Sequence, residues 1–241
     1  MNRRRPATQI VAIVAIFAAL NVVTDSFMSL PEFPSGIWYS WNFLMSPLTG
    51  IILGPLIGFM ANFIGVMIGH FVNFIDTFEF MYTIGAPIGA IISALVFRGK
   101  WKFVIAYYFL LFAAYFSTPV AWQLPFWGMW DTYVALVVLL LVVLLIKLDL
   151  WKYSSSSSLR ARLAIASFIG LEADVLFRIF LLIPCQTYRL FYAWDVETLV
   201  LIWSVGAVGT PIKAVLSTIT TVVIGKPLVN FLQKSKAFIG H

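Results

Sequence analysis

Charged side chains interrupt an apolar run in the second half of the chain. The run over residues 160–184 is long enough to cross a bilayer, yet it contains Glu172, Asp174 and Arg178. An ionisable side chain at the centre of a span costs about 2.5–3.5 kcal/mol on insertion scales, so each one needs a reason. Asp174 and Arg178 are four residues apart and can pair on one helix face, whereas Glu172 points elsewhere. At about 1.5 Å per residue, Arg178 falls close enough to the outer surface to snorkel.

Other polar groups lie at membrane depth in neighbouring apolar runs. Lys213, in the last run, is a possible partner for Glu172 or Asp174. His70 and Asn73 lie one turn apart on the outer half of an earlier run. Two interpretations stay open: the charges form salt bridges that fix helix packing, or they line an outward-open cavity that binds a small molecule.

This cluster does not have the chemistry of a hydrolase. Its Glu-x-Asp-xxx-Arg spacing invites comparison with intramembrane proteases of the CAAX type, but those sites need two downstream histidines, and only His241 follows Arg178. The chain has no Gly-x-Ser-x-Gly motif, no Walker sequence and no Cys/His nucleophile pair. A single cysteine and two histidines also argue against an internal disulfide or a metal centre. We therefore expect no enzymatic activity, no metal and no other cofactor.

The composition places these residues in membrane helices. Of 241 residues, 61% are hydrophobic and 11% are charged, against roughly 25% charged in ordinary soluble domains. Lipid must solvate part of this apolar surface. No polar stretch is long enough to fold separately, so the expected fold class is all-α, with one transmembrane domain over residues 1–241. The net charge of +6 does not indicate nucleic acid, because the basic residues form short clusters between apolar runs.

A bilayer core of about 30 Å needs roughly 20 apolar residues per helix, and eight runs are candidate spans. They cover approximately residues 7–28, 40–54, 55–75, 80–97, 102–120, 131–148, 160–184 and 197–224. The first is interpreted as a helix and not as a signal peptide. The short second run is separated from the third by Gly54-Pro55, which predicts a tight turn at or within the membrane edge. The last contains Gly206, Gly209 and Pro211, so a kink or a partly unwound segment is expected.

Basic and acidic residues alternate between successive connections. Most of the 16 basic residues lie in four clusters, at residues 3–5, 98–102, 147–162 and 226–236. The positive-inside rule assigns these clusters to the cytoplasm, so we expect a multi-pass cell-membrane protein with both termini inside. The opposite connections carry acidic residues, including Asp131, and many aromatic residues. An interfacial aromatic belt explains most of the latter, but the loops 38–41 and 186–194 are also expected to cap the cavity.

Small residues recur at helical spacing in three consecutive runs. The motifs are Gly50/Gly54, Gly65/Gly69 and Gly85/Gly89, and the third run has a longer stripe of Gly58, Asn62, Gly65 and Gly69. Small residues let helix backbones approach closely in lipid, so packing within the chain is expected. The first run carries Ala15 and Ala19, where a partner protein could dock equally well.

Residues 7–102 and 160–236 together resemble the substrate-binding S component of energy-coupling factor (ECF) vitamin transporters. The resemblance lies in Ala15-Ile-Phe-Ala-Ala19, in the segment from Pro47 to Gly58, in Gly85-Ala-Pro-Ile-Gly89 with the basic turn that follows, and in Pro211-Ile-Lys213 through Leu228. S components have six helices. The chain therefore has an additional helical hairpin, expected over residues 102–150.

The resemblance implies a protein that captures a vitamin or similar small molecule at the outer face and has no ATPase of its own. A transmembrane coupling subunit would pack against Ala15 and Ala19, and two ATPase subunits would complete the importer. The alternative is a non-catalytic accessory or assembly subunit of a larger membrane complex. A standalone carrier would be expected to show internal repeats, and none is evident.

We expect ligand contacts from the polar groups at membrane depth and from the aromatic loops. These residues are His70, Asn73, Glu172, Asp174, Arg178, Trp38, Trp41 and Tyr188. The mixed charges favour a polar or zwitterionic ligand whose flat ring stacks on tryptophan or tyrosine.

Overall fold

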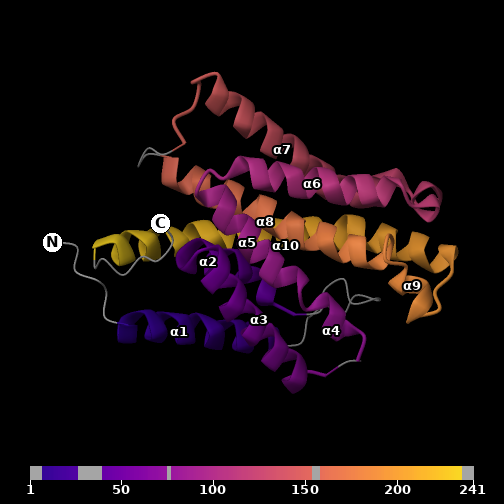
Figure 1. The fold of residues 1–241 in the computed structure, drawn as a ribbon, viewed down its shortest axis with the longest axis horizontal. Helices are drawn as coiled ribbons and strands as arrows, with labels where there is room; N and C mark the ends of the chain where they lie inside the picture. The colour runs from indigo at the N-terminus through magenta and orange to yellow at the C-terminus, as the bar shows by residue number, and fades with distance from the viewer. Residues whose placement is uncertain (1–6, 27–39, 75–76, 154–157, 235–241) are drawn as a thin grey trace.

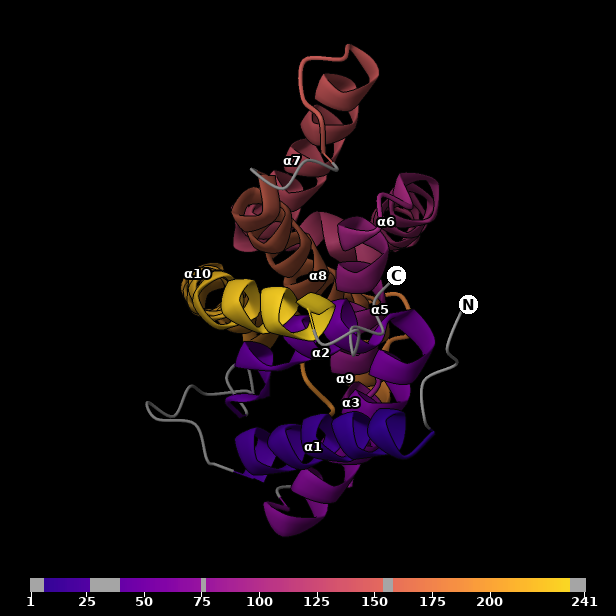
Figure 2. The same cartoon turned by 90° about the vertical axis from the view of Figure 1, so that its left-hand side faces the viewer.

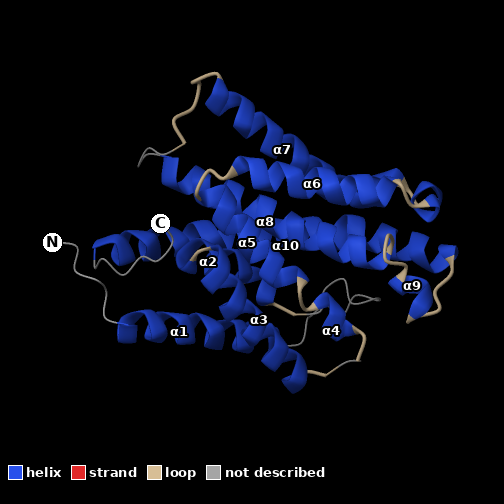
Figure 3. Cartoon of the chain, in the orientation of Figure 1, coloured by secondary structure: helices blue, strands red, loops and turns tan. Residues whose placement is uncertain are grey.

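The computed structural model describes residues 7–26, 40–74, 77–153 and 158–234. These residues form helices joined by short connections, with no β-strand among them (Figure 3). The α-helices are α1 (Ala7–Ser26), α2 (Ser46–Leu53), α3 (Pro55–Val72), α4 (Glu79–Tyr82), α5 (Gly85–Phe97), α6 (Trp101–Phe116), α7 (Trp130–Lys147), α8 (Leu159–Leu182), α9 (Thr187–Leu190) and α10 (Val196–Lys234). Short 3-10 helices are η2 (Asn42–Leu44), η3 (Pro119–Gln123) and η4 (Phe126–Met129). The predicted all-α class is confirmed for the described residues.

The helices are arranged in layers around α8. Helices α1 and α3 lie on one side, and α6 and α7 lie on the opposite side, with α2, α5, α8 and α10 between them (Figures 1 and 2). Helix α8 packs most extensively against α5 and α10, and α1 packs mainly on α3. The centre of the molecule is therefore formed by α8 and its immediate neighbours.

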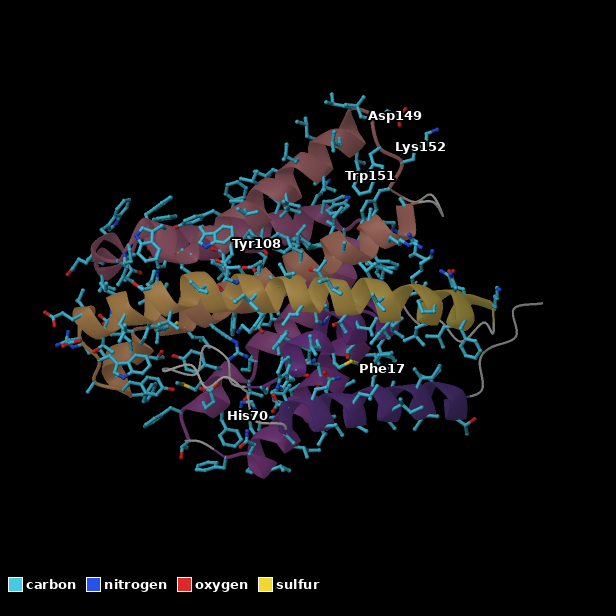
Figure 4. The ribbon with its side chains drawn as sticks, turned by 180° about the vertical axis from the view of Figure 1, so that it is seen from behind. Phe17, His70, Tyr108, Asp149, Trp151 and Lys152 are labelled. Carbon is cyan, nitrogen blue, oxygen red and sulfur yellow. The ribbon has the colours of Figure 1, made fainter. Side chains whose placement is uncertain are left out.

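The connections fall into two groups at opposite ends of the molecule. The start of α1, the α5–α6 turn, the end of α7, the start of α8 and the end of α10 gather at the left of Figure 1. Figure 4, seen from behind, labels Asp149, Trp151 and Lys152 at this end. We call it the basic end, because the described parts of three of the basic clusters, those at 98–102, 147–162 and 226–236, lie there. The opposite end holds η3, η4 and α9.

Four helical segments are long and apolar enough to cross a membrane: Pro55–Val72, Glu79–Phe97, Phe126–Lys147 and Val196–Lys234. Three further apolar helices, Ile10–Ser26, Asn42–Leu53 and Trp101–Phe116, are shorter. Helix α8 has 24 residues but carries several charges. Each predicted run thus contains a helix, while the number of helices that cross a membrane stays a prediction.

The second predicted run is too short to cross a bilayer. Asn42–Leu53 covers about 18 Å at roughly 1.5 Å per residue, against a core of about 30 Å. Every residue of α2 is buried. Helix α2 ends at Gly54, whose φ of +85° favours glycine, and a Cβ atom there would collide with the Arg98 guanidinium. The predicted turn at Gly54 is confirmed, and it lies beside the basic α5–α6 turn.

The small-residue motifs pack helices within the chain, as predicted. Gly65 and Gly69 of α3 lie against Asn21 and Asp25 of α1. Gly50 of α2 meets the backbone of α5. In the third motif, Gly89 lies against the backbone of α8, where a Cβ atom would be 2.8 Å from the Gly170 carbonyl oxygen. Larger side chains at these positions would separate the helices.

Helix α10 is continuous over 39 residues, although it contains Pro211 and Pro227. The expectation of a partly unwound segment near Pro211 is therefore wrong. Proline has no N–H, so it leaves the carbonyl four residues earlier, at Ala207, without its helical donor. The indole N–H of Trp130 donates to the Ala207 oxygen at 2.9 Å and supplies the missing bond. The α-helix continues because the first residue of α7 satisfies the carbonyl.

The hairpin formed by α6 and α7 is attached to α8 through tyrosine hydroxyls. Tyr107 donates to the Ala173 carbonyl oxygen and Tyr108 (Figure 4) to that of Ile169, each at 2.7 Å. At the basic end, the Arg162 guanidinium lies 4.4 Å from the Phe97 ring centroid and donates to the Phe97 carbonyl oxygen at 2.8 Å. The tyrosine contacts thus hold α8 against the hairpin, and the Arg162 contacts hold the start of α8 against the end of α5.

Candidate functional site

A cavity of about 140 Å³ lies among α4, η4, the first turn of α7, α8 and α10. Its charged lining residues are Glu79, Asp131, Arg178 and Lys213, and its aromatic ones are Tyr82, Tyr192, Trp194 and Trp203. A dry cavity of about 150 Å³ can hold benzene. This cavity therefore has room for a compound with one ring, and its walls offer charges of both signs.

Arg178 of α8 is held by two carboxylates at the cavity. Its Nε atom lies 2.7 Å from Asp174 Oδ1, and its Nη1 atom lies 3.7 Å from Glu79 Oε1. The predicted Asp174–Arg178 pair is thus confirmed. The arginine side chain is 28% exposed. It pairs with carboxylates inside the helix bundle, whereas the sequence predicted that it would extend to the outer membrane surface. Gly85 of α5 makes room for this pair, because a Cβ atom there would meet both side chains.

Asp131 is buried, although the sequence places it in an outer connection. It lies in the first turn of α7 and is 2% exposed. Its carboxylate accepts hydrogen bonds from the Thr210 hydroxyl of α10 and from the Thr132 backbone N–H. Lys213, one turn beyond Thr210, lines the same cavity and interacts electrostatically with Asp131 and with Asp174. The first turn of α7 and the middle of α10 thus form one polar wall.

A second cavity of about 30 Å³ lies on the α1 side of Arg178 and Lys213, which line both cavities. Asp25 and His70 form its polar wall: His70 Nδ1 lies 2.7 Å from Asp25 Oδ2. The Ser40 hydroxyl donates to the other Asp25 oxygen at 2.8 Å. His70 lies near the end of α3, beside α1 (Figure 4). The volume and polarity suit about one water molecule.

The structure brings part of the predicted ligand set together. Arg178 lines both cavities, and His70 and Asp174 line the smaller one. The loop 186–194 contributes Tyr192 and Trp194 to the larger cavity, as expected for a capping loop. These residues come from α3, α8 and the segment before α10.

The other predicted residues that the structure describes line neither cavity. Asn73 caps the C-terminal end of α3, and Trp41 lies against the Phe43 ring, with a centroid distance of 5.7 Å. Tyr188 packs against the hydrophobic core, and Glu172 is completely buried in α8. Trp38 lies outside the described residues. The predicted set is therefore not one contiguous site.

The sequence pattern did not indicate Asp25 or Glu79 as site residues, and it placed Asp131 in a connection between helices. Asp25 lies within the first apolar run, where an ionisable side chain is as costly as Glu172 is in its own run. The same reasoning therefore indicates Asp25 as a candidate site residue. Glu79 and Asp131 lie near helix starts, where an acidic residue is also expected for simple electrostatic reasons. Their burial depends on contacts with α8 and α10 that local patterns do not contain.

Among the described residues, no group of three or more His, Cys, Asp or Glu side chains is placed so that it could hold a metal ion. The chain matches no known family model, no curated protein and no solved structure. The resemblance to S components therefore rests on the sequence motifs alone. The site itself is defined by its ion pairs, its volume and its aromatic walls.

Proposed function

We propose that this chain binds a small polar molecule within the membrane and serves as the substrate-binding S component of an ECF-type importer. The observation that carries the proposal is the larger cavity, which combines Arg178, Lys213 and Asp131 with aromatic walls. Charged side chains at membrane depth are best tolerated beside a wet or ligand-filled pocket. Salt bridges alone would not require an open volume among them.

In this proposal, all eight apolar runs enter or cross the membrane, and both termini lie in the cytoplasm. The basic end faces the cytoplasm because lysine and arginine are retained there during insertion. The cavity then opens toward the outer face. Helices α6 and α7 form an additional hairpin on a six-helix core, in which α2 and α3 are joined at Gly54 near the basic end.

The cavity favours a vitamin-like compound with one flat ring. Its volume of about 140 Å³ is smaller than the roughly 300–1,000 Å³ of sites for drug-sized ligands. Arg178 and Lys213 suit an acidic group on the ligand, and Asp131 suits a basic one. Trp203 and Tyr192 offer ring surfaces for stacking.

Helix α1 offers the face through which a coupling subunit would dock. Ala15 and Ala19 are exposed, whereas Phe17, Asn21 and Asp25 of the same helix are buried. The two alanines therefore point away from α3 and leave a smooth surface. In this proposal the coupling subunit packs there and connects the chain to two ATPase subunits.

The decisive experiment is to purify the chain in mild detergent, extract bound small molecules and identify them by mass spectrometry. The compounds found are then tested for thermal stabilisation. A ligand at 100 times its dissociation constant should add about 2.7 kcal/mol. Arg178→Met should abolish this gain. Arg189→Met, a matched change of an exposed arginine in α9, should retain it.

Two results would oppose the proposal. One is that no extracted or added compound stabilises the protein. The other is that Arg178→Met and Arg189→Met respond equally to the ligand. Purification of the chain in a stable complex that contains no ATPase subunits would favour an accessory subunit instead.

A further inference from the structure

Glu172 differs from the other acidic side chains near the cavities. Its exposed fraction is 0%, and neither of its carboxyl oxygens has a hydrogen-bond partner among the described residues. Asp174 and Glu79 each pair with Arg178, and Asp131 accepts two hydrogen bonds. An ionised carboxylate that is removed from water needs such partners, and without them it takes up a proton instead.

The groups around Glu172 come from several helices. Its electrostatic neighbours are Asp131 of α7, Asp174 of α8 and Lys213 of α10, and Tyr108 of α6 also interacts with it. Tyr107 of α6 interacts with Asp174, which is itself paired with Arg178. Helices α2 and α5, which also pack on α8, carry no ionisable side chain.

We propose that Glu172 carries a proton in the folded protein, and that Asp131 and Lys213 link this proton to the state of the larger cavity. The Glu172 and Asp131 carboxyl groups lie near one ammonium group, that of Lys213, so ionising both carboxyl groups leaves one negative charge uncompensated. A proton on the less solvated of the two carboxyl groups removes this excess charge. Glu172 is that carboxyl, because water reaches neither of its oxygens.

The link to the cavity follows from its lining. Asp131 and Lys213 both line it, while Glu172 lies behind them and lines neither cavity. A bound acidic group would draw the Lys213 ammonium toward itself and strengthen proton binding at Glu172. A bound basic group would pair with Asp131 and weaken proton binding at Glu172. The reverse effect of the proton on ligand affinity has the same magnitude, because linkage is reciprocal.

This inference does not depend on the identity of the ligand or on the ECF assignment, and its test needs no ligand. Infrared spectra of the purified full-length chain are recorded in detergent across a pH series, with glutamate labelled by ¹³C in its side-chain carboxyl group. We expect a protonated-carboxyl band at pH 7 in the wild type. Glu172→Gln should remove the band. Glu197→Gln, at the exposed start of α10, should keep it.

The link to the cavity is tested by two variants with opposite expected effects. Asp131→Asn removes a neighbouring negative charge, so the band should disappear at a pH lower by one unit or more, a tenfold loss of proton affinity. Lys213→Met removes a neighbouring positive charge, so the band should persist to a higher pH. Each variant is compared with the wild type in the same detergent.

Three outcomes would overturn the inference. If the labelled wild type shows no protonated-carboxyl band at pH 7, Glu172 is ionised, and this result stands even if Glu172→Gln does not fold. If Glu172→Gln folds and keeps the band, the proton belongs to another glutamate. If neither cavity variant moves the titration, the proton is not linked to the cavity.

Discussion

Asp25 and His70 connect α1 to α3 at the level of single residues. Their contact of 2.7 Å is nearly fully buried. A second polar contact lies deeper, where the Asn62 side-chain amide donates to Asn21 Oδ1 at 2.7 Å. Apolar packing gives little net drive for helix association in lipid, so polar contacts between helices contribute a larger share. Helix α1 should therefore depend on these few side chains for its position.

We predict that Asp25→Ala lowers the free energy of unfolding by about 1–3 kcal/mol, because it leaves the buried His70 ring without its carboxylate. Unfolding is measured in detergent by titration with a denaturing detergent. Val23→Ala, on the exposed face of α1, serves as the control and should have a much smaller effect. In the double variant Asp25→Ala/His70→Ala, the two losses should not add. Simple additivity would contradict a direct contact.

Asp195 gives a second prediction at this scale. Its carboxylate accepts the Thr198 backbone N–H at 2.8 Å, just before the first turn of α10. Hydrogen bonds from Thr198 hold the pKa of Asp195 below its ordinary value. This contribution to stability is complete above the aspartate pKa of the unfolded chain, about 3.9. It is lost as the pH falls through the lower pKa of the folded state.

We therefore expect hydrogen-exchange protection in the first turn of α10 to fall over that acidic range. Asparagine also caps helices but does not titrate, so Asp195→Asn should keep the turn protected without the pH dependence. An identical pH response in this variant would show that Asp195 does not control the turn.

At the residue scale, local spacing predicted the Asp174–Arg178 pair because both side chains lie on one helix face. It could not predict the Asp25–His70 pair, whose members lie 45 residues apart on different helices. Spacing also indicated that Glu172 points away from Arg178, but it could not show whether a neighbouring helix supplies another partner for Glu172. The packing around α8 decides this, and it leaves both carboxyl oxygens of Glu172 without a hydrogen-bond partner among the described residues.

Helix α10 shows how one element depends on another. The Trp130 indole of α7 replaces the backbone donor that Pro211 lacks. We predict that Trp130→Phe lowers the free energy of unfolding by about 1–2 kcal/mol, because the Ala207 carbonyl is left without a donor. Adding Pro211→Ala should restore most of this loss by supplying a backbone N–H. The measurement is again detergent-induced unfolding.

Trp122→Phe is the matched control for Trp130→Phe. The Trp122 indole N–H also donates to a carbonyl, that of Phe116, but at an exposed helix end where water can replace it. Loss of the Trp122 hydrogen bond should therefore change the free energy of unfolding very little. If Pro211→Ala does not rescue Trp130→Phe, the tryptophan stabilises the protein through ring packing and not through its N–H.

The sequence predicted the positions of the helices better than it predicted whether a helix is interrupted. Apolar length located most long helices within a few residues but ended α10 at residue 224, ten residues before its end at Lys234. The Gly65/Gly69 motif correctly indicated close packing of α3. The same approach predicted a kink or a partly unwound segment in α10, because glycine and proline are helix breakers when considered locally, and the helix is not unwound there. The stabilising donor comes from Trp130, in a different part of the chain, so no pattern around Pro211 contains it.

At the scale of the whole molecule, the basic connections share one end. We predict that this end faces the cytoplasm, and cysteine labelling on intact cells tests it. Gln123 in η3 and Leu150 after α7 are exposed at opposite ends of the hairpin. In a Cys185→Ser background, a membrane-impermeant thiol reagent should label Gln123→Cys directly and Leu150→Cys only after lysis. The opposite pattern would reverse the orientation.

The choice of positions follows from the structure. Gly128 lies in the same connection as Gln123, but a Cβ atom there would collide with Trp203, so a cysteine would disturb the cavity wall. Burial raises the pKa of the Cys185 thiol, which lowers its reactivity at neutral pH. Replacing Cys185 still removes the remaining background labelling by the native thiol.

Helix α10 has a mechanical consequence through its length. Its 39 residues extend about 58 Å at roughly 1.5 Å per residue. Even at a tilt of about 40°, the upper limit usually seen, the helix covers about 45 Å along the bilayer normal, well beyond the hydrocarbon core of about 30 Å. If α10 crosses the bilayer as we propose, part of it therefore lies beyond the lipid tails, and its final turns are at the basic end. Since α10 is α-helical without interruption from Thr210 and Lys213 to Lys234, we expect a tilt of α10 that starts at the cavity to move these final turns as well.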